Sequence, residues 1–253
     1  MSGTVDITQD AGVLTLLMNR PDKKNALTDA MYGAMASAME QAEADPAVRV
    51  VAIRGAGDLF CAGNDIGDFL NASNRVGEAN VFRFIRLLGS FTKPLLVGVQ
   101  GRAVGIGTTM LLHCDHVVLA EDAKLSTPFV NLGLVPEAAS SLLLPAAIGH
   151  QRAFAMLAMG EVMEAQEALA AGLANTVVPN DELDDAVAKA ALRFSALPPG
   201  AVQATKALMR DPGLVAAKME AEIELFAQRL QSAEAREAFT AFMEKREPDF
   251  SKF

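Results

Sequence analysis

The pattern of hydrophobic and polar positions defines the first elements of the chain. Residues 4–10 and 13–19 alternate and then turn apolar on either side of Gly12, which predicts two β-strands joined by a turn. After a loop rich in Pro, Asp and Asn, residues 30–44 carry Met, Ala and Glu with a helical period. Thr28 is placed to cap that helix.

Short apolar runs then alternate with longer helical stretches. The runs have the length of buried strands, and glycines close several of them. The pattern predicts strands at 50–54, 95–101 and 116–120 and helices at 76–91 and 105–114. Strands that alternate with helices along a chain favour an α/β fold.

The second half of the chain is mostly helical. We expect helices at 137–147, 150–158, 164–171, 182–195, 200–210 and 214–246, with one short strand at 174–179. The break Pro198-Pro199-Gly200 predicts a boundary between a core domain, residues 1–197, and a C-terminal helical domain, residues 198–253. The tail has apolar positions at helical spacing, which pack either on its own core or on another subunit.

Composition narrows the class of protein. The chain has 253 residues, of which 51% are hydrophobic and 21% charged, so one large domain with at most a small appendage is expected. A net charge of −9 without a long basic run argues against nucleic acid as a partner. No apolar run reaches about 18 residues, and the N-terminus does not resemble a signal peptide, so we expect no membrane partner and a cytoplasmic location.

The two cysteines, Cys61 and Cys114, have neither disulfide-framework nor zinc spacing. Both lie among apolar residues, which favours buried thiols in a reducing compartment. We therefore expect no metal site, and nothing in the pattern indicates a separate cofactor.

Three segments are candidates for chemistry. In FCAGNDI (60–66) and GRAVGIGTT (101–109), glycines precede a helix start and leave backbone N–H groups exposed, in the second case at a positive helix end. The second segment lacks the Gly-Lys-Ser/Thr ending of a phosphate-binding loop. Pro136-Glu137 is the third, as a helix start whose carboxylate could serve as a base in an apolar pocket. Taken singly, each segment is also explained by ordinary turns, close packing or an acidic first helical turn.

Together and in order, these segments resemble the enoyl-CoA hydratase/isomerase (crotonase) superfamily. The matching stretches are MNRPDKKNAL (18–27), FCAGNDI (60–66), GRAVGIGTTMLLHCD (101–115), STPFVNLGLVPEAASSLLLPAAIG (126–149) and FMEKREPDF (242–250). The resemblance implies a crotonase (ClpP-like) α/β fold of repeated ββα units. It also implies a helical tail that builds homotrimers, usually paired into hexamers.

The resemblance also implies an acyl-CoA substrate and a site. The backbone N–H groups of Asn64 and Ile106 would form an oxyanion hole for a thioester enolate. Lys245 of the tail is a candidate for the CoA phosphates. Contacts to CoA, which is part of the substrate and not a separate cofactor, are implied for Lys24, Ala26, Ala62, Asp65 and Ile66.

The reaction depends on which carboxylates are present. Hydratases of the family carry two glutamates, but this chain has Thr109 and Phe129 at those positions, whereas Glu137 matches the single glutamate of Δ3,Δ2-enoyl-CoA isomerases. The branch that the stretches AVGIGTTMLL (103–112) and TPFVNLGLVPEAASS (127–141) look most like is the peroxisomal type of those isomerases. We expect Phe129 and Leu134 to form part of an apolar wall and residues 67–92 to shape the acyl pocket. Two alternatives remain open: another acyl-CoA reaction, such as atypical hydration or hydrolysis, and a catalytically silent acyl-CoA-binding protein.

Overall fold

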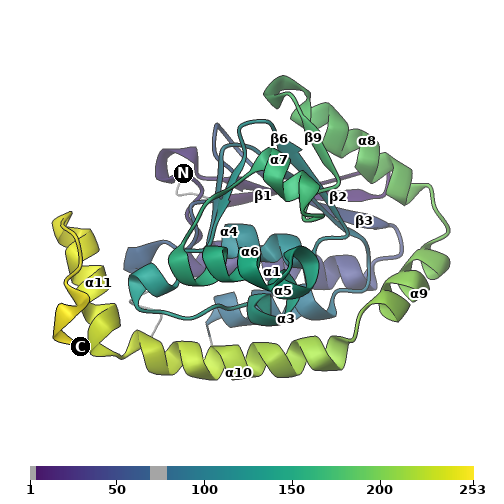
Figure 1. Cartoon of the computed structure of the whole chain (residues 1–253). Coiled ribbons are helices and arrows are strands. Elements are labelled where there is room, and N and C mark those ends of the chain that lie inside the picture. The colour runs from purple at the N-terminus through teal and green to yellow at the C-terminus, as the bar shows by residue number, and fades with distance from the viewer. Residues whose placement is uncertain (1–3, 69–78) are drawn as a thin grey trace.

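The computed structural model describes residues 4–68 and 79–253, folded around a six-stranded sheet (Figure 1). The strand order is β1-β2-β3-β4-β6-β9, with β1 antiparallel to β2 and the other neighbours parallel. Its strands are β1 (Thr4–Asp10), β2 (Val13–Asn19), β3 (Val50–Gly55), β4 (Leu95–Val99), β6 (His116–Ala120) and β9 (Thr176–Val178). The α/β prediction is confirmed, and each of these strands was expected at its place in the chain.

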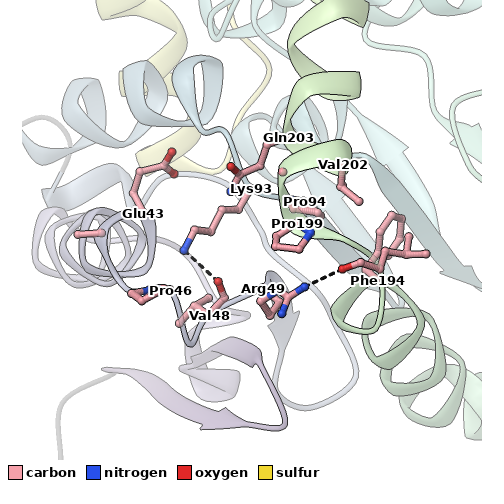
Figure 2. A pocket seen from close by; sticks show the side chains of 13 residues that line it. Glu43, Pro46, Val48, Arg49, Lys93, Pro94, Phe194, Pro199, Val202 and Gln203 are labelled. Carbon is pink, nitrogen blue, oxygen red and sulfur yellow. Dashed lines mark hydrogen bonds between the residues drawn. The ribbon is translucent and has the colours of Figure 1, made fainter.

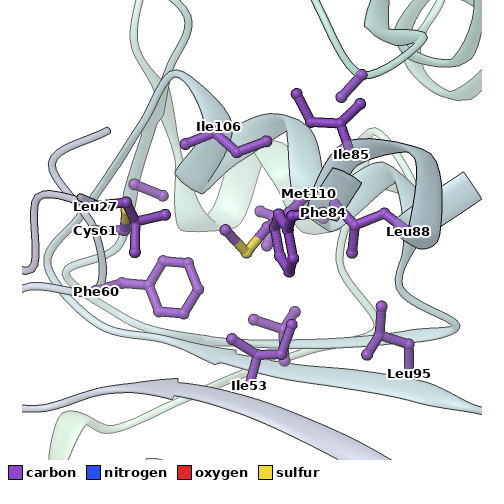
Figure 3. Packing of buried hydrophobic residues seen from close by; sticks show 14 of the residues in the cluster. Leu27, Ile53, Phe60, Cys61, Phe84, Ile85, Leu88, Leu95, Ile106 and Met110 are labelled. Carbon is purple, nitrogen blue, oxygen red and sulfur yellow. The ribbon is translucent and has the colours of Figure 1, made fainter. Parts of the chain in front are cut away.

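Both faces of this sheet are covered by helices. Val51 and Ile53 of β3 face the main core with α1 (Asp29–Ala44) and α3 (Asn80–Ser90), where Figure 3 shows Ile53, Phe84 and Leu88 packed together. Val50 of the same strand faces the other way, toward Val187 of α8 (Leu183–Ser195). A strand buried on both faces reads as a continuous apolar run, which is why β3 shows no alternation.

A smaller three-stranded sheet escaped the sequence prediction. It has the order β5-β7-β8, with β5 (Arg102–Val104), β7 (Lys124–Ser126) and β8 (Met163–Glu164). Strands of two or three residues are too short to produce a recognisable alternation. This small sheet matters because β5 is part of the second glycine-rich segment and leads directly into Gly105 and α4.

The predicted helix at 105–114 is a short α4 (Ile106–Thr109) that continues as a 3-10 turn (Met110–His113). The predicted helix at 150–158 is α6 (His150–Phe154) followed by a π-helix (Ala155–Met159). The predicted helix at 164–171 is α7 (Ala165–Ala170), and that at 76–91 is α3, with residues 76–78 outside the described part of the chain.

The prediction of a helix at 137–147 was wrong at its start. The helix is α5 (Ser140–Ile148), because Ala138 and Ala139 adopt left-handed backbone angles, with φ of 56° and 55°. Two left-handed residues in a row cannot continue a right-handed helix. Glu137 therefore lies in a loop and not in a first helical turn.

The tail forms three α-helices, α9 (Pro199–Met209), α10 (Pro212–Leu230) and α11 (Ala233–Glu244), and a 3-10 turn at Phe250–Lys252. The expected single helix at 214–246 was wrong, because Ser232 begins a new helix and its side chain accepts a hydrogen bond from the Ala235 N–H at 3.1 Å. Met219 and Ile223 of α10 are buried in the main core, and Figure 1 shows α10 running along α3 and α5. The tail therefore packs on its own core; the domain boundary at residue 198 stays a prediction.

A buried lysine joins α1 to the sheet. Lys93 is 5% exposed, and its Nζ donates to the carbonyls of Ala42, Asp45 and Val48 at 2.5, 2.7 and 2.9 Å. Figure 2 shows this lysine in a pocket beside Arg49, which donates to the Leu197 carbonyl. Both cations of this pocket are bonded to backbone carbonyls, so their role there is structural.

We expect Lys93→Met to lower the free energy of unfolding by about 2–4 kcal/mol, since it removes charge-assisted hydrogen bonds and leaves buried carbonyls unpaired. Lys189→Met, on the exposed face of α8, is the matched control. Chemical denaturation of both variants measures the difference. Equal losses in the two variants would show that the buried lysine contributes nothing specific.

The two thiols are free, and their environments support the sequence interpretation in part. Cys61 is fully buried and burial raises its pKa to about 12, so it behaves as a small apolar side chain. Cys114 is only half-buried.

Across residues 4–68 and 79–253 no helix is long and apolar enough to cross a bilayer, and no cluster of His, Cys, Asp and Glu is arranged to hold a metal ion.

Candidate active site

Backbone hydrogen bonds hold the first glycine-rich segment between two others. The Cys61 N–H donates to the Arg102 carbonyl at 3.1 Å, and the Cys61 carbonyl accepts from the Val104 N–H at 2.9 Å, so the segment pairs with β5. On its other side, the Leu27 N–H donates to the Gly63 carbonyl at 2.8 Å. Both glycine-rich segments and the loop that ends at Leu27 are thus joined in one backbone network.

Within this network the Asn64 N–H is not used. The Asp65 N–H donates to the Leu27 carbonyl at 2.9 Å, so the pairing with Leu27 uses the residues on either side of Asn64 and not the Asn64 N–H itself. Ile106 begins α4, so its N–H has no preceding turn to donate to. Neither N–H has an acceptor among the described residues, which leaves both available as oxyanion donors.

Two glycines allow the segments to approach closely. Gly63 has a φ of +90°, and a Cβ there would lie 3.1 Å from the Val104 carbonyl oxygen. A Cβ on Gly107, the second residue of α4, would lie 2.9 Å from Cys61 Cβ and 3.0 Å from the Cys61 oxygen. The first turn of α4 therefore lies directly against the first segment, and Figure 3 shows Ile106 above Cys61 and Leu27.

Glu137 is buried beside α4. Its side chain is 8% exposed, and its Oε1 accepts a hydrogen bond from Thr109 Oγ1 at 2.5 Å. Its Oε2 is buried and has no partner in the part of the chain that the structure describes. Thr109 lies one helical turn after Ile106, so the carboxylate and the second N–H donor are fixed to the same short helix.

The environment of Glu137 suits a base near neutral pH. Burial, as the main cause, raises the pKa of its carboxyl to about 8, the hydrogen bond from Thr109 opposes that rise, and the charge of Glu222 adds to it. A general base works best when its pKa lies near the working pH. The sequence identified Thr109 only as a missing carboxylate, whereas the structure makes it the hydrogen-bond donor to the base.

Two more side chains of the site escaped sequence analysis. Tyr32, the only tyrosine of the chain, donates its hydroxyl hydrogen bond to Asn64 Oδ1. Its buried position raises the pKa of the phenol well above 10, and the charges of Cys61 and Glu137 contribute in the same direction. His113 Nε2 lies 2.8 Å from the Ala138 carbonyl oxygen, next to Glu137. Both contacts join residues far apart in sequence, so no local pattern announced them.

The residues expected to contact CoA lie on two stretches, 24–26 and 62–66, that run side by side. The Ala62 N–H donates to the Lys24 carbonyl at 3.0 Å, and Arg20 Nη1 bonds both the Ala26 carbonyl, at 3.0 Å, and Asp65 Oδ2, at 2.7 Å. Arg20 was missed by the sequence analysis although it joins two of the expected residues. Ile66, the fifth, is half-buried against the main core, whereas the Lys24 side chain is exposed.

Lys245, the residue of the tail that was expected to bind the CoA phosphates, is exposed at the C-terminal end of α11.

The residues expected around the acyl group are described in part. Phe129 and Leu134 are both buried in the same core as Ile106, and the Leu134 N–H donates to the Phe129 carbonyl at 2.9 Å. Of the expected acyl-pocket region 67–92, residues 69–78 lie outside the described part.

An α/β core that carries two unpaired backbone N–H groups and a buried carboxylate of raised pKa has the groups that oxyanion-stabilising enzymes use. The chain belongs to the enoyl-CoA hydratase/isomerase family, whose model matches residues 8–252. The resemblance to the crotonase superfamily and to its fold is thereby confirmed.

Individual relatives carry different activities. "Enoyl-CoA delta isomerase 2" of Rattus norvegicus is 37% identical over 210 residues, which are 81% of this chain and 54% of the relative, so the chain spans about half of that protein. "1,2-epoxyphenylacetyl-CoA isomerase" of Escherichia coli is 32% identical over 96% of both chains. An enoyl-CoA hydratase/isomerase structure from Pseudoalteromonas atlantica superposes with a TM-score of 0.93 at 41% identity, covering 98% of this chain and 99% of the other. The comparisons establish the family. Which reaction of the family this chain catalyses must be inferred from the residues of its site.

Proposed function

We propose that the chain is a Δ3,Δ2-enoyl-CoA isomerase that uses Glu137 as its single base. The observation that carries the proposal is the free, buried Oε2 of Glu137, on a carboxyl whose pKa is raised to about 8. The two other positions where the family's hydratases carry glutamates hold Thr109 and Phe129. One carboxylate suffices for a 1,3-proton shift, whereas the usual hydration uses two.

The reaction follows from these positions. Glu137 removes a proton from C2 of a 3-enoyl-CoA, and the electron pair of the C2–H bond spreads over the thioester and the C3=C4 double bond. The N–H groups of Asn64 and Ile106 stabilise the charge on the thioester oxygen. Protonated Glu137 then delivers its proton to C4, which leaves a C2=C3 double bond conjugated with the thioester. A positioned base contributes about 10²–10⁴-fold and each oxyanion donor about 10²–10³-fold.

The rest of the substrate has two proposed sites. The segment that joins Lys24 and Ala26 to Ala62 and Asp65 binds the CoA moiety. The buried pair Phe129 and Leu134 forms part of the apolar wall around the acyl group. An apolar wall of this kind also explains why the carboxyl of the base is protonated more readily than in water.

The proposal separates isomerisation from hydration. With 3-hexenoyl-CoA we expect rapid formation of the conjugated 2-enoyl product, and with crotonyl-CoA we expect little 3-hydroxybutyryl-CoA. Both are followed by ultraviolet absorbance and chromatography. Fast hydration of crotonyl-CoA would contradict the single-base mechanism.

The pH dependence provides a second test. Because Glu137 acts as a base only when ionised, kcat/KM is expected to rise with pH up to about 8 and then level off. Thr109→Val removes the hydrogen bond that lowers the pKa of Glu137, so the rising limb should move to higher pH and the rate at pH 7 should fall. Thr205→Val on exposed α9 is the control. An unmoved limb in Thr109→Val would show that Thr109 does not tune the base.

A second candidate is another enolate reaction on the same site, supported by the match to the epoxide isomerase over 96% of both chains. A product survey over a panel of acyl-CoA thioesters distinguishes it. Binding of CoA thioesters without any turnover would favour the silent binding protein instead.

We also propose assembly into homotrimers or pairs of trimers. Leu208 and Met209 at the end of α9 and Phe242 and Met243 at the end of α11 are exposed apolar side chains on the tail. Light scattering of the purified protein measures the mass, and a monomer would contradict the proposal.

A further inference from the structure

Helix α10 of the tail carries a buried carboxylate. Glu222 is 7% exposed, and its Oε1 accepts hydrogen bonds from the Ser141 N–H at 3.0 Å and from Ser141 Oγ at 2.5 Å. Its Oε2 is buried and has no partner among the described residues. A buried carboxylate with one unpaired oxygen costs stability, so this residue requires an explanation.

The contact is a helix cap supplied from a distant segment. Ser141 is the second residue of α5, and the N-cap residue Ala139 has no side chain that can accept the free N–H groups of the first turn. A carboxylate at a helix N-terminus satisfies these donors and also interacts favourably with the helix dipole. Glu222 accepts the Ser141 N–H and places a negative charge at the start of α5, although it lies 81 residues later in the sequence.

The capped turn is continuous with the catalytic loop. The Ser140 N–H donates to the Glu137 carbonyl at 3.0 Å, and Ala138 and Ala139 between them are both left-handed. Two such residues in a row are unfavourable for alanine and persist only when the surroundings fix them. His113 fixes this loop at the Ala138 carbonyl, and Glu222 fixes it at Ser141.

We propose that Glu222 is a positioning residue for Glu137, which caps α5 from the helical tail and places a second carboxylate within electrostatic range of the base. The active site is then incomplete without the tail, whose α10 holds the catalytic loop in place. This inference rests on the role proposed for Glu137.

The charges around Glu137 make the effect measurable. Tyr32 of α1 lies within electrostatic range of Glu137, and Thr109 of α4 donates a hydrogen bond to it. The Glu222 carboxylate is the charge that raises the pKa of Glu137 in the described part of the chain. Lys218, on the same helix as Glu222, lowers the pKa of Glu222 by its positive charge. Loss of the Glu222 charge should therefore lower the pKa of Glu137.

Two substitutions separate position from charge. Glu222→Gln keeps an oxygen acceptor for Ser141 and removes the charge, whereas Glu222→Ala removes the cap as well. Glu224→Gln, two residues on at an exposed position of the same helix, removes an equal charge and is the matched control. Thermal unfolding of each variant establishes that it is folded.

The titration of Glu137 is read without turnover, from the infrared carbonyl band of its protonated carboxyl, identified by its loss in Glu137→Gln in each background. In Glu222→Gln we expect this titration and the rising limb of kcat/KM to move to lower pH, with both unchanged in Glu224→Gln. In Glu222→Ala we expect kcat to fall by about 10–100-fold with little change in KM, as for a base displaced by about 1 Å.

The outcomes for the two proposals differ. An unmoved infrared titration in Glu222→Gln, or a kcat in Glu222→Ala equal to that of wild type, would overturn the positioning role. A shifted titration in an enzyme that does not isomerise 3-enoyl-CoA would support that role and contradict the proposed reaction.

Discussion

Glu137→Gln is expected to lower kcat for 3-hexenoyl-CoA by about 10²–10⁴-fold, the contribution of a positioned general base. The glutamine keeps the shape of the side chain and the contact with Thr109 but cannot accept the C2 proton. KM should change little, because the CoA-binding segment around Lys24 and Ala62 is untouched. Absorbance of the conjugated product measures the rate.

Stability provides the control for this variant. The folded-state pKa of Glu137 is about 8, above the ordinary 4.5, so the folded protein binds the proton more tightly than the unfolded chain. The stability of the wild type should then fall as pH rises from about 4.5 through 8, since the buried carboxyl must ionise. Glu137→Gln removes that penalty and should unfold at a higher temperature than wild type at pH 9. Turnover near the wild-type rate in this variant would eliminate Glu137 as the base.

Gly107→Ala is expected to lower kcat/KM by about 10²-fold through the oxyanion hole. The added methyl would lie 2.9 Å from Cys61 Cβ and 3.0 Å from the Cys61 oxygen, so α4 must move away from the first segment. That movement separates the N–H donors of Ile106 and Asn64. Steady-state kinetics with 3-hexenoyl-CoA measure the loss.

Gly200→Ala is the matched control, because a Cβ on this α9 residue meets nothing within 4 Å. It should be at least as stable as wild type, since alanine favours a helix over glycine, and equally active. Equal activity of Gly107→Ala and Gly200→Ala would show that close contact between the two segments is not needed for catalysis.

Elements with a strong local pattern were predictable from sequence. The strand at 116–120 and the helix capped by Thr28 appear where expected, because their apolar spacing and the cap act locally. The start of α5 at Ser140 and the break at Ser232 were not predicted. Both depend on backbone angles and contacts that tertiary structure imposes on sequences of good helix formers.

The site divides in the same way. Asn64, Ile106 and Glu137 were found from glycine-rich turns, an apolar environment and a family resemblance. Among the described residues, the N–H groups of Asn64 and Ile106 and the Oε2 of Glu137 have no hydrogen-bond partner. The hydrogen bond from Thr109 to Glu137 and that from Ser141 to Glu222 span 28 and 81 residues. Spacing along the chain cannot reveal such contacts, because they are set by how α4, α5 and α10 pack.

The measurement that tests the central claim most directly uses 3-hexenoyl-CoA labelled with deuterium at C2. A single base that removes the C2 proton and returns it at C4 should transfer part of the deuterium to C4 of the 2-enoyl product, detectable by NMR or mass spectrometry. Because Glu137 is buried, exchange of its proton with water should be slow enough to leave that transfer visible. Two results would contradict the single-base mechanism. One is the absence of isomerisation, and the other is a product in which the hydrogen newly added at C4 comes entirely from solvent at early conversion.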